Sequence, residues 1–224
     1  NVVGSTGAGK TEFLRCLLGD LFEPSTEAQR RSKTENIVDA THTWFRISKK
    51  REESTTTISL NTVGILLVRT LFNSIEFHPV EEVEQLLLRD DIEEIWQFVF
   101  FDNAGQERFD FMPQITMRGA DAVIILADGT NMASIEKISY FIELTREEEY
   151  RASDGVNQIP VLILLNKKDL IEHGCYIGLQ SVRHMIGAAE EYVLYETSMK
   201  TGEGVDDTIR TLISQLYEKS LVKR

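Results

Sequence analysis

The chain has 224 residues, of which 42% are hydrophobic, so it is long and apolar enough for one domain with a buried core. Its formal net charge of −12 excludes general nucleic-acid binding and direct adsorption to acidic membranes, because like charges repel. Two cysteines, Cys16 and Cys175, are too few for a disulfide scaffold and fit no metal-ligand pattern, which indicates a reduced, cytosolic setting. No apolar run approaches the roughly 18–20 residues needed to cross a bilayer, so we expect no transmembrane segment.

Strand-like and helix-like stretches alternate along most of the chain. The end of a first strand lies at residues 1–3, and apolar residues at helical spacing predict a helix over 10–22. Further strands are expected at 58–72, 95–101, 121–128, 160–166 and 192–198, and further helices at about 132–148, 179–191 and 205–219. Continuous apolar strands suit a sheet that is covered on both faces. The alternation therefore predicts an α/β fold with a mostly parallel central sheet and helices on both faces.

Two polar stretches interrupt this alternation, at about 22–56 and at about 73–94. Neither has the composition of a low-complexity linker. We interpret both as insertions into a single α/β domain that spans residues 1–224. The second insertion is expected to contain a short helix after Pro79.

The segment GSTGAGKT, residues 4–11, matches the phosphate-loop pattern G-x-x-x-x-G-K-[ST] between a strand and a helix. Its three glycines let backbone N–H groups turn toward an anion, and the helix N-terminus adds a positive dipole end. Lys10 can reach the outer phosphates, and the Thr11 hydroxyl can bind Mg²⁺. The alternative is a glycine-rich turn with no ligand. The motif predicts a nucleoside triphosphate without specifying the base.

A second phosphate signal lies at FFDNAGQERF, where an apolar strand ends in a carboxylate. Asp102 can hold a water of the Mg²⁺ shell, and the Gly105 N–H can meet the terminal phosphate. Gln106 can orient an attacking water. The alternative is that Asp102 and Asn103 cap a helix, a role compatible with the first.

The base is predicted from LLNKKDL, which places Asn166, Lys167 and Asp169 just past a buried strand. A carboxylate can accept both N–H groups on the guanine edge, and adenine offers no such pair, so Asp169 would select guanine. The stem of Lys167 can lie against the base. After the last strand, Ser198, Met199 and Lys200 are placed where a backbone N–H can meet the guanine oxygen. An ordinary polar loop is the alternative for the first of these segments.

These pieces together resemble the Ras-like small GTPases: GSTGAGKT, DNAGQERF, NKKD and ETSMKTG stand in the order of that family. The stretch GQERFDFMPQITMRGADAVIILAD is similar to the Rab, Arf and MglA-type branch, in which it forms the second switch. The resemblance covers roughly residues 1–21 and 57–219. It implies a three-layer P-loop NTPase fold and a GTPase that cycles between GTP and GDP with Mg²⁺. It also implies exchange-factor, GTPase-activator and effector partners. Separately, the basic patch of the 22–56 insertion can touch acidic lipid, which would be a weak peripheral contact with a membrane surface.

The resemblance assigns roles to individual residues. Those expected to contact the nucleotide are Gly4, Ser5, Thr6, Gly7, Ala8, Gly9, Lys10, Thr11, Gly105, Asn166, Lys167, Asp169, Ser198, Met199 and Lys200. Gln106 and Lys10 are the expected catalytic residues. The expected metal-binding residues are Thr11, Thr57 and Asp102.

Thr57 is chosen for the first switch loop because it directly precedes Ile58, which is expected to start a strand. Thr55 and Thr56 are alternatives in the same cluster, and the whole cluster can instead be plain β-rich surface.

The chain departs from the family pattern at a few positions. Asn103 stands where many members have threonine, and Met199 replaces a usual alanine, whose N–H it keeps. Thr6 lies where Ras itself has glycine, and it would crowd an arginine finger from a partner. The stretch between Lys10 and Thr57 is much longer than in typical members.

Two other functions are weighed. A nucleotide-locked scaffold would bind GTP or GDP with negligible turnover, and an intact Gln106 opposes it. A P-loop ATPase is opposed by Asn166 and Asp169.

The 22–56 insertion is either a partner-facing element with Trp44 and Phe45 as anchors, or a solvated loop. Its basic residues are Arg30, Arg31, Lys33, Arg46, Lys49, Lys50 and Arg51.

Overall fold

The computed structural model describes residues 1–18, 45–51, 54–72, 74–102, 112–153, 158–187 and 192–222. The chain divides into two compact units. Unit 1 consists of Asn1–Leu17 and Asn103–Arg224, and unit 2 of Leu18–Asp102. The expectation of one domain over the whole chain remains a prediction.

Unit 1 contains a parallel sheet in the order β1-β6-β7-β8. Its strands are β1 (Val2–Gly4), β6 (Val123–Asp128), β7 (Val161–Asn166) and β8 (Val193–Glu196). All six residues of β6 and all six of β7 are buried, as expected for continuous apolar strands covered on both faces. Because the strands are parallel, their carboxyl ends meet at one edge, where Asp128 pairs with Asn166.

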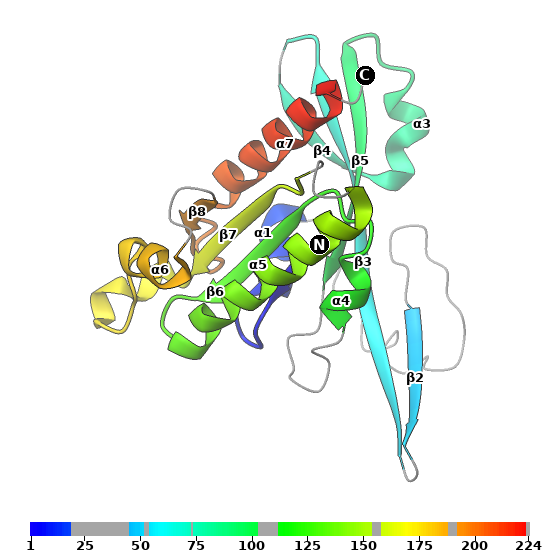
Figure 1. Ribbon diagram of the computed structural model, residues 1–224. Coiled ribbons are helices and arrows are strands. Elements are labelled where there is room, and N and C mark those ends of the chain that lie inside the picture. The colour runs from blue at the N-terminus through cyan, green and yellow to red at the C-terminus, as the bar shows by residue number, and fades with distance from the viewer. Residues whose placement is uncertain are drawn as a thin grey trace. The chain divides into compact units, whose positions relative to one another are not determined.

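The helices of unit 1 cover this sheet. They are α1 (Lys10–Leu18), α4 (Met112–Thr116), α5 (Met132–Ser153), α6 (Leu179–Ile186) and α7 (Val205–Val222). Figure 1 shows α5 lying along β6 and β7 on one side of the sheet, with α1 behind them. Ile135 and Ile138 of α5 and Val182 of α6 share one core with alternate residues of the strands, among them Ile125 and Ile163. The apolar residues that recur at helical spacing in α5 thus face the sheet.

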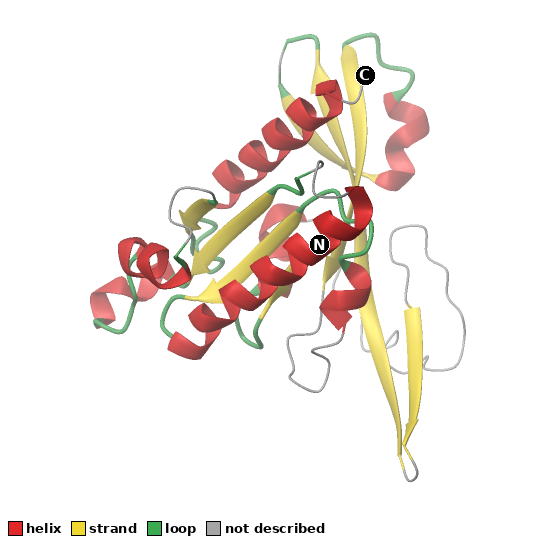
Figure 2. Ribbon diagram, in the orientation of Figure 1, coloured by secondary structure: helices red, strands yellow, loops and turns green. Residues whose placement is uncertain are grey.

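Unit 2 is built on a long antiparallel pair (Figure 2). β3 (Ser54–Thr70) pairs with β5 (Ile92–Asp102) from Asn61↔Asp102 to Thr70↔Ile92. On its other edge, β3 pairs with β2 (Phe45–Arg51) and with β4 (Ile75–Pro79), both antiparallel. The chain after Pro79 forms the 3₁₀ turn η2 (Val80–Glu82) and the short helix α3 (Val83–Leu86), as the sequence predicted.

A small apolar core holds α3 against the strands of unit 2. Leu66 and Val68 of β3 and Leu86 of α3 are buried together. Leu66 and Val68 are two positions apart, so they lie on the same face of their strand. This contact fixes the short helix, which has too few residues to be stable by itself.

The expected α/β fold with a parallel sheet and flanking helices is confirmed. Two strands were not predicted, β2 and β4, and both fall within the stretches interpreted as insertions. The sequence FRISKKR of β2 has few apolar residues, so it lacks the hydrophobic signal of a buried strand. The β3–β5 pair is antiparallel, so the parallel order holds for unit 1 and not for unit 2. Within the described residues, no helix has the length and apolar character that a membrane span requires.

Removing one buried side chain should test the importance of the unit 1 core. Leu164 of β7 is fully buried. We expect Leu164→Ala to lower the free energy of unfolding by about 2–5 kcal/mol, because it loses buried apolar area and leaves a cavity. Urea unfolding followed by circular dichroism measures this. Met132→Ala, at an exposed position on α5, is the control and should change the free energy by about 0.5 kcal/mol or less. Equal losses in both variants would contradict the assigned core.

Candidate functional site

The phosphate loop lies between β1, which ends at Gly4, and α1, which begins at Lys10. Gly7 and Gly9 have φ of 77° and 101°, a region that side chains other than glycine rarely adopt. A Cβ on Gly9 would overlap the side-chain amide of Asn166, whereas a Cβ on Gly7 would meet nothing within 4 Å. The loop is therefore packed on the Gly9 side and open on the Gly7 side. This arrangement, at the start of a nine-residue helix, fits a phosphate group.

Lys10 folds back over the phosphate loop. Its side chain is buried, and its ammonium donates hydrogen bonds to the carbonyl oxygens of Gly4 and Ser5, each at 2.9 Å. Because a buried ammonium needs hydrogen-bond acceptors, these carbonyls hold the charge at the loop. A phosphate on the loop would meet this ammonium directly.

Asn166, the last residue of β7, joins the phosphate loop to the loop after β8. Its buried side-chain Nδ2 donates to the carbonyl of Ala8 at 2.9 Å, and its Oδ1 accepts the N–H of Met199 at 3.0 Å. The Cys16 thiol on α1 donates to the Met199 carbonyl at 2.9 Å, and burial raises the pKa of that thiol. The two loops predicted to hold the phosphates and the base are thus connected through one side chain. Among the residues of the segment expected to offer a backbone N–H to the guanine oxygen, Met199 donates its N–H to Asn166 here.

Asp169 lies on the 3₁₀ turn η4 (Lys168–His173), which follows β7. Its Oδ1 accepts a hydrogen bond from the Ser198 hydroxyl at 2.8 Å, and its Oδ2 lies 3.7 Å from the Lys200 ammonium. The side chain is about four-fifths buried, with 19% of its area exposed. A carboxylate has about four acceptor positions, so Asp169 keeps acceptor capacity for two further N–H groups.

Asp128, which the sequence analysis did not assign, positions Lys167. The Lys167 ammonium lies 2.5 Å from Asp128 Oδ2. Oδ1 of Asp128 accepts the N–H of Thr130 at 2.9 Å and its hydroxyl at 2.7 Å. Burial alone would raise the pKa of Asp128, but the hydrogen bonds from Lys167 and Thr130 outweigh it and hold this pKa below its ordinary value. The sequence carried one signal for this residue, a carboxylate that ends the buried strand β6.

Lys167 has an unusual backbone. Its φ is 70°, and among the described residues it is the one non-glycine residue with a positive φ. Such a conformation costs a non-glycine residue about 1–2 kcal/mol. The surrounding structure therefore holds Lys167 in place, as is often observed at functional sites.

Ser134 on α5 links the phosphate loop to Asp128. Its hydroxyl lies 2.5 Å from the hydroxyl of Ser5 and also accepts the backbone N–H of Asp128 at 2.9 Å. Ser134 is buried. The helical pattern at 132–148 places Ser134 near the start of a helix but gives no sign that its hydroxyl contacts other segments. The sequence analysis therefore missed this residue. The phosphate loop is thus connected to the segments predicted to bind the base at two separate points.

The remaining predicted residues belong to unit 2 or lie outside the described residues. β5 ends at Asp102, as predicted. β3 starts at Ser54 rather than at Ile58, so Thr57 lies within a strand, paired with Ser48, and the predicted strand boundary is wrong. A polar run of serine and threonine continues the strand because these residues suit β-structure, which the apolar pattern does not reveal. Gly105 and Gln106 lie outside the described residues.

Comparisons with known proteins identify the family of the chain. The family model described as the Ras family matches residues 54–218, more than half of the chain. Ras-related protein Rab-5B of Plasmodium falciparum is 29% identical over 120 residues, covering 53% of each chain. Ypt/Rab-type GTPase YPT7 of Saccharomyces cerevisiae is 29% identical over 123 residues, 54% of this chain and 57% of its own.

A human protein is similar to the chain as well. Ras-related protein Rab-26 of Homo sapiens is 33% identical over 123 residues, 54% of this chain and 44% of its own. The chain spans about half the length of these curated relatives. The family match, the Rab names of the relatives and the parallel sheet with a phosphate loop at its edge lead to one conclusion: the chain belongs to the Ras family of small GTPases.

Proposed function

We propose that the protein is a guanine-nucleotide switch that hydrolyses GTP to GDP and phosphate. The observation that carries this proposal is the Asn166 amide, which joins the phosphate loop at Ala8 to the base-binding loop at Met199. One nucleotide that bridges these loops would have its phosphates at one end and its base at the other. Membership of the Ras family supports the same activity.

The phosphates are held by the backbone N–H groups of the phosphate loop and by the ammonium of Lys10. When they bind, they replace the carbonyl partners that Lys10 has at Gly4 and Ser5. The base lies against the stem of Lys167, with its N–H edge on the carboxylate of Asp169. Adenine lacks the two donors that this carboxylate needs, so its binding would leave a mostly buried charge poorly paired.

Hydrolysis requires a water aligned with the terminal phosphate. Gln106 orients this water, and the Gly105 N–H contacts the terminal phosphate. The hydroxyls of Thr11 and Thr57 and the carboxylate of Asp102 are oxygen ligands of the kind that Mg²⁺ prefers. The ion, when bound, neutralises charge that develops on the phosphates. Such a site works by positioning and charge stabilisation, so slow intrinsic turnover is expected.

The nucleotide state would be sensed by partner proteins. An exchange factor, a GTPase activator and effectors are part of the proposal because family membership supports them. A reduced, cytosolic setting with peripheral membrane contact is proposed as well. The free state of Cys16 and Cys175 fits the reduced setting, and the membrane contact rests on the basic residues of the 22–56 insertion.

Gln106→Leu should slow hydrolysis while leaving nucleotide binding intact. We expect single-turnover hydrolysis of GTP with Mg²⁺ to fall by about 10-fold or more, because the leucine side chain cannot orient the water. Rapid-quench measurement of phosphate release tests this. The GDP dissociation constant, measured with a fluorescent analogue, serves as the control and should stay within twofold. Binding without hydrolysis in both proteins would contradict a self-sufficient hydrolase and favour a nucleotide-locked scaffold.

Asp169→Ala should remove the preference for guanine. We expect the affinity for GTP to fall by about 100-fold or more and that for ATP to stay weak and unchanged, because the paired acceptors are lost. Competition of GTP and ATP against a fluorescent GDP analogue measures both affinities. Glu172→Ala changes an exposed carboxylate on the same 3₁₀ turn and is the matched control. Equal loss of GTP and ATP binding would show a fold defect instead.

Asp128→Asn should loosen the base-binding site through Lys167. We expect GDP to dissociate about 10-fold faster, because a charge-assisted hydrogen bond of about 1.5–3 kcal/mol is weakened. Stopped-flow release of a fluorescent GDP analogue measures the rate. The Asp128→Asn, Lys167→Met double variant should release GDP no faster than Lys167→Met alone. Additive effects would contradict a role through Lys167. Glu136→Gln, at an exposed position of α5, is the control.

A further inference from the structure

One end of unit 2 presents four large apolar side chains to solvent. They are Leu71, Phe72, Leu87 and Leu88, with 63%, 84%, 70% and 84% of their area exposed. Ten large apolar side chains are exposed in the described part of the chain, so four of the ten gather here. The connection between β3 and β4 and the segment between α3 and β5, which carry them, lie at the same end of unit 2 in Figure 1. We call these four residues the tip surface.

Hydrogen bonds hold the two halves of the tip surface together. The N–H of Leu71 donates to the carbonyl of Asp91 at 2.8 Å. The Arg89 guanidinium, just after Leu88, donates to Asp91 Oδ2 and to Glu76 Oε2, each at 2.7 Å. Arg89 therefore ties the segment after α3 both to β4 and to the start of β5. Leu71 and Phe72 on one segment, and Leu87 and Leu88 on the other, are therefore held in fixed positions relative to each other.

The local backbone accounts for the exposure of these side chains. Thr70 is buried, its N–H donates to the carbonyl of Ser74 at 3.0 Å, and the hydroxyls of these two residues lie 2.7 Å apart. This closed turn leaves Leu71 and Phe72 outside. At the other half, Leu86 is buried in the unit 2 core.

The residues after Leu86 continue its helical turn. The N–H of Leu87 donates to the carbonyl of Val83 at 3.0 Å, and the N–H of Leu88 donates to that of Gln85 at 3.2 Å. With Leu86 facing the core, these hydrogen bonds direct the next two side chains away from it. The tip surface is therefore displayed by ordered turns, and its side chains cannot be buried within unit 2 without breaking them.

The stretch of chain that carries the tip surface is rich in acidic residues. Residues 69–94 include eight carboxylates and two arginines. Both arginines are engaged within unit 2, Arg89 with Glu76 and Asp91, and Arg69 with Glu93 and Glu94. The excess of carboxylates includes Glu84 and Asp90, which are exposed beside Leu87 and Leu88 in the sequence.

The excess negative charge in this stretch of the chain limits which partners the tip surface can bind. A second copy that met this surface with its own tip surface would bring the same excess of carboxylates, and an anionic bilayer would bring phosphates or carboxylates, so both would be repelled. A complementary partner has apolar side chains for the tip surface and basic side chains for its rim. We propose that the tip surface binds an amphipathic, lysine- or arginine-rich segment of a partner protein. None of the residues involved belongs to the nucleotide motifs, so this proposal does not depend on GTP hydrolysis.

An unbiased peptide selection tests the proposal. A phage-displayed library of random peptides is panned on the whole protein and counter-selected on the Phe72→Ser, Leu88→Ser double variant. Both positions are exposed, so the variant should fold, which circular dichroism verifies. The expected result is that tip-dependent binders are enriched in lysine or arginine together with leucine or phenylalanine. No enrichment, or enrichment of acidic or neutral peptides, would overturn the proposal.

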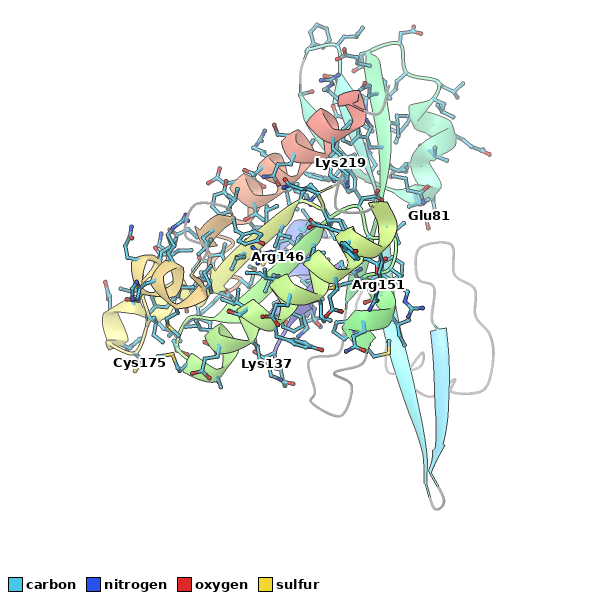
Figure 3. The ribbon with its side chains drawn as sticks, in the orientation of Figure 1. Glu81, Lys137, Arg146, Arg151, Cys175 and Lys219 are labelled. Atoms are coloured by element: carbon cyan, nitrogen blue, oxygen red, sulfur yellow. The ribbon has the colours of Figure 1, made fainter. Side chains whose placement is uncertain are left out.

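Direct binding of one enriched peptide separates the apolar and charged contributions. By fluorescence anisotropy, Phe72→Ser, Leu88→Ser should weaken binding at least 10-fold. Glu84→Gln, Asp90→Asn should weaken it at least threefold, with reduced dependence on salt. Tyr150→Ser changes an exposed aromatic residue of unit 1 and should have no effect. Glu81→Gln changes an exposed carboxylate on η2, at the opposite end of α3 from the tip surface (Figure 3), and should also have no effect.

Two further measurements exclude the other occupants. Sedimentation of the whole protein should give the same mass with and without the Phe72→Ser, Leu88→Ser changes. A dimer that these changes dissolve would overturn the proposal in favour of self-association. Vesicles of phosphatidylcholine and phosphatidylserine should not bind through the tip surface, and vesicle binding that the same changes abolish would overturn the proposal in favour of a membrane.

Discussion

The buried carboxamide of Asn166 is the interaction on which the arrangement of unit 1 depends. Its two ends serve two loops that are far apart in the sequence, through Ala8 and through Met199. An amide buried without partners would cost about 1–3 kcal/mol, so the side chain and both loops stabilise one another. The preceding strand, β7, is buried at every position and gives Asn166 a fixed base. Removing the amide would leave the Met199 N–H and the Ala8 carbonyl without this partner.

A second set of contacts joins the same regions by another route. Ser5 in the phosphate loop meets Ser134, Ser134 accepts the N–H of Asp128, and Asp128 holds Lys167. Both routes join the phosphate loop to segments that follow the strands of unit 1. Preorganisation of this kind lowers the entropy that a ligand must lose on binding. It is consistent with a site whose geometry exists before the nucleotide arrives.

The sequence predicted those parts of the molecule whose signals are local. Motif spacing located the phosphate loop and Asn166, and continuous apolar runs located β6 and β7. The role of Asp128 depends on the pairing of β6 with β7, which places it beside Asn166, and a single sequence does not reveal strand neighbours. β2 was missed because five of its seven residues are polar and four of these are consecutive, a pattern that resembles a surface loop. The start of β3 was misplaced at Ile58 because threonine and serine carry no hydrophobic signal, although they fit a strand.

At position 167, the residue that best suits the left-handed backbone differs from the residue that is proposed to bind the nucleotide. Glycine would adopt a φ of 70° without a steric penalty, so replacing Lys167 by glycine should relieve strain in the empty protein. The same change would remove the stem and the charge that Asp128 holds. In a library with every amino acid at this position, selection for folding alone should favour glycine, and selection for nucleotide binding should favour lysine. With Lys167 in its proposed role, binding rather than folding would determine which residue is retained at this position.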